Sequence, residues 1–116
     1  MAAQTPAKFV HDGTMVDYTP GADTPAGAVV VQTDLLGVAP VPIKAGQLGG
    51  LSVVGVFDFP KAMGAGSGAP AGTLFYWDAA ALAATKNAAA GANKLLGKSV
   101  KATVDADGFV RVRMQQ

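Results

Sequence analysis

The chain reads LSVVGVF from Leu51 to Phe57, and this stretch is its strongest strand signal. Successive side chains of a strand point to opposite faces of a sheet, so Leu51, Val53 and Phe57 would share one face. Val54 and Val56 would lie on the other face. Because both faces are largely apolar, the stretch predicts a single central strand that is covered on both sides.

Shorter apolar runs on either side of this stretch are separated by Gly, Pro, Asn and Asp. The pattern is typical of short strands in a β-sandwich or barrel. The four apolar residues of 28–31 predict a further strand covered on both sides, and Asp105-Ala106-Asp107-Gly108 predicts a hairpin turn between the last two strands. The other strands are expected at residues 8–10, 14–19, 73–78, 97–104 and 108–114.

Two segments do not follow this pattern. Residues 63–72 consist mostly of Gly, Ala, Pro and Ser, and are expected to form a mobile surface loop. Residues 79–92 are rich in Ala, which has the highest helix propensity, and Asp78 could cap a first helical turn. However, Leu82 is the one large apolar side chain there, and packing supplies most of a helix's stability. Both conformations stay open for residues 79–92, and we favour an irregular or extended path.

The length of 116 residues and the apolar content of 50% fit one domain with a buried core. We therefore predict an all-β, compact single-domain fold with little helix. Residues 14–116 would form the β domain, and residues 1–13, which show no pattern, a flexible N-terminal arm.

The composition offers few groups for catalysis, since the chain has one His and no Cys. The lack of Cys excludes disulfides, thiolate nucleophiles and Cys-based metal centres. His11 precedes Asp12, but neighbours on an extended chain point to opposite faces and do not form a relay. The segment from Gly91 to Ser99 misses the spacing of a phosphate-binding loop by one residue. We expect no enzyme, no cofactor and no metal site.

The sequence also bears on location. Its first residues lack the basic flank and apolar run of a secretory signal. The longest uncharged stretch, residues 62–77, is rich in Gly, Ala and Pro and is shorter than the about 20 apolar residues that a spanning helix needs. We therefore expect synthesis and retention in a cytoplasm, with no membrane partner.

Charge is divided unevenly, because residues 1–60 carry more Asp than Lys while residues 61–116 carry an excess of Lys and Arg. One interpretation is complementarity between subunits, in which opposite halves attract each other. The other, which we favour, is that both halves interleave in one barrel and their charges cancel.

A basic strip is expected on the terminal strands. Arg111 and Arg113 are two residues apart and share one strand face, opposite Val110 and Val112. With Lys98 and Lys101, and with Tyr76 or Trp77 nearby, this strip would resemble a surface that binds single-stranded nucleic acid. The simpler interpretation is the polar side of a half-buried strand, because the net charge of +1 is small for a protein that neutralises phosphates. Nucleic acid is therefore not the expected partner.

Several short motifs together resemble a known family. The motifs are FVHDG at 9–13, GVFDFPK at 55–61, LFYWD at 74–78, LGK at 96–98 and VRVR at 110–113. In this order they are similar to the DUF2190 family of tailed-phage and prophage capsid cement, or decoration, proteins. The resemblance covers nearly the whole chain, and each motif is structural rather than catalytic. Some family members carry a recombinase label, which the failed phosphate loop argues against.

The resemblance implies a compact β fold, barrel-like or of the β-tulip type. It implies a virion structural protein that binds the exterior of an assembled bacteriophage capsid as a homo-oligomer and stabilises the shell without catalysis. The partners would be the major capsid protein and other copies of the chain, as a homotrimer rather than a dimer. Synthesis would take place in the cytoplasm of the host bacterium.

The expected contact residues follow from this role. Lys8, Phe9 and Val10 in the arm are suited to adding a strand to a capsid protein's sheet edge, with Phe9 filling a pocket. Phe59, Arg111 and Arg113 are candidates for an oligomer or capsid interface. The alternative function is a small β-barrel that binds single-stranded nucleic acid through the basic strip.

Overall fold

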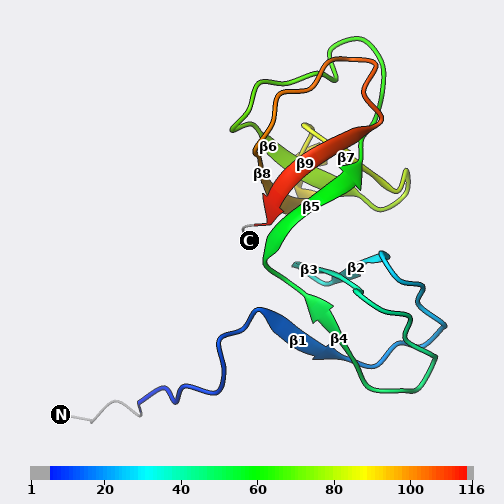
Figure 1. Cartoon of the computed structure of the whole chain (residues 1–116), viewed down its shortest axis with the longest axis vertical. Coiled ribbons are helices and arrows are strands. Elements are labelled where there is room, and N and C mark those ends of the chain that lie inside the picture. Colours follow the sequence, from blue (N-terminus) through cyan, green and yellow to red (C-terminus); the bar gives the residue numbers. More distant parts are fainter. Residues whose placement is uncertain (1–5, 115–116) are drawn as a thin grey trace.

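The computed structural model describes residues 6–114 as an almost entirely β structure (Figure 1). One antiparallel sheet contains β1 (Met15–Tyr18), β2 (Val29–Gln32), β3 (Leu35–Val38) and β4 (Gly49–Ser52). A second contains β5 (Gly55–Pro60), β6 (Leu74–Asp78), β7 (Ala83–Thr85), β8 (Lys94–Ser99) and β9 (Phe109–Met114). Within the described residues, the helical structure is one short 3₁₀ segment, η1 (Ala89–Gly91). The expectation of an all-β fold with little helix is confirmed.

The four-stranded sheet has the order β1-β4-β3-β2. Strands β2 and β3 form a hairpin in which Val29 pairs with Val38, and Thr33 in the turn between them has a positive φ of 56°. Strand β2 is therefore at an edge of the sheet, and Val31 on it is 36% exposed. Both faces of the run are partly covered, as predicted, because Val29 packs against the larger core cluster and Val30 against the smaller one, while Val31 is exposed.

The five-stranded sheet has the order β5-β9-β8-β6-β7 and curls back on itself. Lys61, directly after β5, forms a parallel bridge with Ala84 in β7. The Ala62 N–H donates to the Ala84 carbonyl oxygen at 3.1 Å. The first and last strands of this sheet thus meet at one point, which gives this part of the molecule the expected barrel-like character.

Residues 51–57 do not form one strand, so that prediction is wrong. The chain leaves the four-stranded sheet after Ser52 and enters the five-stranded sheet at Gly55. Gly55 has a φ of 127°, a conformation that side chains disfavour and glycine adopts readily. The continuous apolar pattern arises because the two halves of the stretch face different parts of the core. Figure 1 shows the change of direction between β4 and β5.

The segments that lacked a strand pattern are held by polar contacts. Ala69, within the expected loop 63–72, forms a bridge with Thr103 and is 6% exposed. The Asp78 carboxylate accepts hydrogen bonds from the N–H groups of Ala80 and Ala81, as a helix cap would. No helix follows it: Leu82 has a φ of 53° and is 66% exposed, so it anchors nothing. The favoured irregular or extended path for residues 79–92 is confirmed.

The two ends of the β region differ in how well they match expectation. Residues 8–10 form no strand. The turn before β9 forms as predicted, since the Asp107 carboxylate accepts from the Val104 N–H at 2.9 Å and the Asp107 N–H donates to the Val104 carbonyl. Strand β8, however, ends at Ser99 rather than at residue 104.

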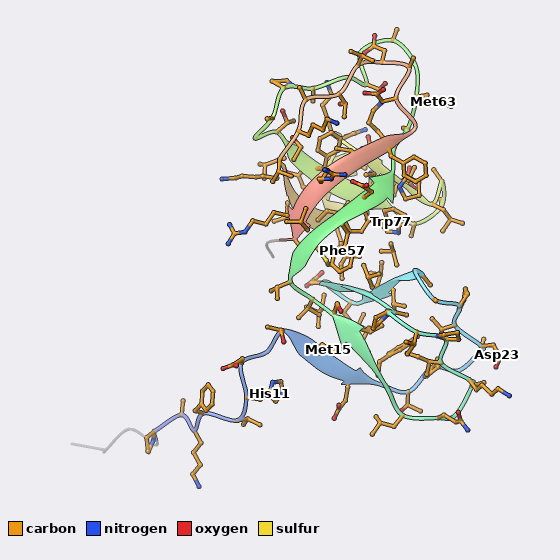
Figure 2. All side chains as sticks on the ribbon, viewed as in Figure 1. His11, Met15, Asp23, Phe57, Met63 and Trp77 are labelled. Carbon is orange, nitrogen blue, oxygen red and sulfur yellow. The ribbon has the colours of Figure 1, made fainter. Side chains whose placement is uncertain are left out.

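One hydrophobic core joins the two sheets. Leu36 and Val38 from the four-stranded sheet belong to the same buried cluster as Phe75, Leu96 and other residues of the five-stranded sheet. Figure 2 shows Phe57 on the side of the five-stranded sheet that faces the four-stranded one. A smaller cluster under the four-stranded sheet contains Ala39, Ile43 and Leu51.

Candidate interaction surfaces

The described part of the arm, residues 6–13, extends away from both sheets (Figure 1). Phe9 and Val10 are 82% and 83% exposed, and Lys8 is exposed beside them. His11 Nδ1 accepts a hydrogen bond from the Gly13 N–H at 2.9 Å, which turns the chain before β1. Residues 1–5 of the predicted arm lie outside the described residues. The arm thus presents two large apolar side chains that its own sheets do not cover.

Strand β9 presents its basic residues on the outer face of the five-stranded sheet. Arg111 and Arg113 are exposed, whereas Val110, Val112 and Met114 are buried. The alternation follows from the period of two along a strand. The predicted division of β9 into a basic face and an apolar face is confirmed.

Strand pairing adds residues from three other strands to this face. Arg113 lies opposite Val56 of β5 on one side and opposite Lys98 of β8 on the other. Lys98 in turn lies opposite Leu74 of β6. Val56, Arg113, Lys98 and Leu74 therefore form one line across the sheet, called the outer row below. Its central cations have no ion-pair partner in residues 6–114, and its ends, Val56 and Leu74, are 53% and 43% exposed.

Arg111 differs from Arg113 because it is paired. Its Nε donates to Asp58 Oδ1 at 2.9 Å, and a terminal nitrogen lies 3.3 Å from Oδ2. This hydrogen-bonded guanidinium holds the pKa of Asp58 below its ordinary value and raises the pKa of Arg111. The charge of Arg111 is thus balanced within the chain. Asp58, which the sequence did not single out, comes opposite Arg111 through the register of β5 and β9.

Phe59 is placed differently from the expectation for an interface residue. It is 2% exposed, and the centroid of its ring lies 6.1 Å from the ring centroid of Phe57 and 6.2 Å from that of Trp77. In this position Phe59 is a core residue of the chain, which differs from the exposed position expected for an interface residue. The alternation along β5 places Phe59 inward and Asp58 outward.

The same burial weakens the nucleic-acid hypothesis. Trp77 is 4% exposed and Phe75 is fully buried, so neither ring is free to stack on a base. Tyr76 is half-buried between them along the strand. The basic strip is present, but Phe75 and Trp77, two of the three aromatic side chains of the neighbouring run, belong to the core.

The acidic and basic halves interleave in part, because β5 belongs to residues 1–60 but lies in the five-stranded sheet, paired with β9. Residues 15–52 supply the strands of one sheet and residues 55–114 those of the other. Opposite charges of the two halves meet within the described chain at Lys94 Nζ and Asp34 Oδ1, 2.9 Å apart, and at Arg111 Nε and Asp58 Oδ1, also 2.9 Å apart. The other charges of the two halves remain separated. Opposite charges on neighbouring copies of the chain can therefore attract each other.

Residues 6–114 contain no cluster of three or more His, Cys, Asp or Glu side chains arranged to hold a metal ion. In the same part of the chain, no helix has the length and apolar character needed to cross a membrane.

The chain was compared with known protein families, curated proteins and solved structures. A family model described as phage cement protein matches residues 10–114, which include Val10 of the arm and both sheets. No curated protein and no solved structure matches the chain.

Proposed function

The chain belongs to the phage cement protein family, and from this premise we propose that it binds the exterior of an assembled capsid as a homo-oligomer and stabilises the shell. Membership gives the chain a structural role associated with the phage capsid. The observation that carries the proposal is the family match over residues 10–114. The proposed activity is binding alone, without catalysis or cofactor.

The arm is the proposed clamp. Lys8, Phe9 and Val10 extend from the sheets with their side chains exposed, as an extended peptide must before it adds to the edge of another sheet. Burial of a side chain such as Phe9 in a pocket contributes about 1.5–3 kcal/mol. The proposed partner of the arm is the major capsid protein.

The outer row is the proposed second contact. Arg113 and Lys98 lie side by side without an ion-pair partner in the described chain, between the exposed Val56 and Leu74. A surface with apolar ends and a basic centre suits an acidic partner surface. We propose that it contacts either another copy or the capsid. Arg111 has a smaller part, because Asp58 already balances its charge.

Oligomerisation would strengthen binding. We propose a homotrimer, in which several arms engage several capsid subunits and weak contacts combine through a high effective concentration. A ligand that binds the assembled shell, but not its free subunits, stabilises the shell by mass action. The proposed location is the capsid exterior, after synthesis in the cytoplasm of the host bacterium.

Capsid binding is the direct test. Purified protein is mixed with expanded capsids of its own phage that lack it, and bound protein is measured by sedimentation. We expect saturable binding and a higher temperature of capsid rupture. Absence of saturable binding would contradict the proposed function, and the solution mass of the free protein tests the trimer separately.

The role of the arm has its own test. Deletion of residues 1–12 should leave the sheets folded and reduce capsid binding, because the clamp is removed. Phe9→Ser should weaken binding about tenfold or more, from the loss of the buried ring. Leu48→Ser is the matched control, since Leu48 is an exposed apolar residue far from the arm in the sequence, at 71% exposed. Equal binding by the deletion variant and the full chain would refute the clamp.

A further inference from the structure

A pocket lies beside the glycine-rich segment that follows β5. Its volume is about 380 Å³, and it is placed between the end of β5, residues 62–67 and the segment that follows β7. None of its residues belongs to the arm or the outer row. The lining residues include Lys61, Ser67, Phe75, Ala84, Lys86 and Asn87.

Lys61 is a buried cation in the wall of this pocket. It is 5% exposed, and its Nζ donates to the Ala62 carbonyl oxygen at 2.8 Å and to Ser67 Oγ at 3.0 Å. The Ser67 hydroxyl in turn donates to the Gly64 carbonyl oxygen at 2.6 Å. An ammonium group has three N–H donors, so one donor of Lys61 is left over.

Asp105 interacts electrostatically with Lys61 and Lys86 but forms no direct ion pair with either of them. Both oxygens of Asp105 accept backbone N–H groups, from Gly68 at 2.7 Å and from Gly66 at 3.2 Å. Among the described residues, the ion pairs within 4.0 Å join other side chains, so neither Lys61 nor Lys86 has a carboxylate at that distance. Two lysines and one aspartate leave an excess of one positive charge. A buried charge without a close counter-ion is costly, and an added anion relieves that cost.

Further donors line the same pocket. Lys86 Nζ uses one N–H on the Gly68 carbonyl oxygen at 2.8 Å, which leaves two. Asn87 Oδ1 accepts from the Ala89 N–H, and the Asn87 side-chain amide has no acceptor within residues 6–114. Ala62 and Ala65 of the lining are exposed and supply an apolar wall that a ligand can reach, whereas Phe75 and Ala84 are fully buried.

We propose that this pocket binds a carboxylate, namely the acidic side chain of a protein partner. The single excess positive charge matches one carboxylate, and the donors of Lys61, Lys86 and Asn87 supply its hydrogen bonds. The apolar wall packs against the methylene groups that carry the carboxylate in Asp or Glu. The inference concerns ligand chemistry and does not rest on the proposed capsid role.

The test is a titration of the full chain with glutarate, followed by amide NMR at constant ionic strength. We expect saturable shifts confined to residues 61–68 and 84–89, with a millimolar dissociation constant. Lys86→Gln should weaken binding about tenfold, because it removes a charge-assisted hydrogen bond. Lys101→Gln is the control, since it removes the same charge outside the pocket and should leave the affinity unchanged.

Lys86 is chosen because it is exposed, whereas substitution of the buried Lys61 also perturbs folding. Absence of saturable shifts, or equal weakening by Lys86→Gln and Lys101→Gln, would overturn the proposal. A parallel titration with inorganic phosphate distinguishes binding of a carboxylate from binding of phosphate. Binding of phosphate with no binding of glutarate would also overturn it.

Discussion

Asp105 gives the glycine-rich segment its path. Its carboxylate accepts the N–H groups of Gly66 and Gly68, which lie far from it in the sequence. Hydrogen bonds to the charged form favour that form, and those from Gly68 and Gly66 hold the pKa of Asp105 below its ordinary value. The expectation of a mobile loop at residues 63–72 took no account of this anchor.

Asp105 should make the stability of the folded chain depend on pH under acidic conditions. A group with a depressed pKa contributes stability above its unfolded pKa of about 3.9, and this contribution is lost as the pH falls through the lower, folded value. Asp105→Asn should lower the melting temperature at neutral pH. It should also reduce the decrease in melting temperature that occurs as the pH falls below about 4. Melting curves of both proteins across this range measure the effect, with Asp17→Asn as the control on an exposed strand position. Parallel acid profiles for Asp105→Asn and the unchanged chain would contradict it.

At the scale of elements, the sequence pattern predicted those features that depend on the geometry of a single strand or turn. The alternation from Val110 to Met114 predicted which side of β9 is buried, and the turn at Asp105–Gly108 formed where its residues indicated. The break at Gly55 was not predictable from periodicity, because the residues on both sides of it are apolar. A positive φ there is a result of the tertiary structure that moves the chain between sheets.

The features of the candidate site also divide into those that depend on one strand and those that depend on the pairing of separate strands. To predict that Arg111 and Arg113 share one face, only the alternation along a single strand is needed, and the sequence contains that alternation. The neighbour relation of Arg113 and Lys98, and the pairing of Arg111 with Asp58, required the register between separate strands. Phe59 shares a face of β5 with Phe57, and the charged Asp58 between them was a signal that Phe59 points inward.

Gly55 should be sensitive to any side chain. In Gly55→Ala, the φ of 127° is strained and the new Cβ lies 3.2 Å from Phe57 Cε2. We expect a loss of more than about 1 kcal/mol in the free energy of unfolding, measured by urea denaturation. Gly27→Ala is the matched control, since Gly27 also has a positive φ but its Cβ would meet no atom within 4 Å. A smaller loss for Gly55→Ala than for Gly27→Ala would argue against a constrained crossing.

At the scale of the whole molecule, the shared core should couple the two sheets. Leu36 of β3 is fully buried in the cluster that contains Trp77 of β6. Leu36→Ala should cost about 2–5 kcal/mol, because it leaves a cavity in that cluster. The loss should appear equally in Trp77 fluorescence, which reports on the five-stranded sheet, and in far-ultraviolet circular dichroism.

Leu48→Ala provides the comparison for Leu36→Ala, because Leu48 is 71% exposed. Its effect should stay within about 0.5 kcal/mol. Two separate transitions in the unchanged chain, one for each probe, would contradict a single cooperative unit.

The chain passes from one sheet to the other once, at residues 53–54. Each sheet is therefore encoded by an uninterrupted stretch of gene. A genetic crossover at this junction can exchange one sheet for that of a related phage and leave every strand pairing of the other intact. Among the described residues, the shared apolar contacts and the Lys94–Asp34 pair join the two sheets and would have to adapt.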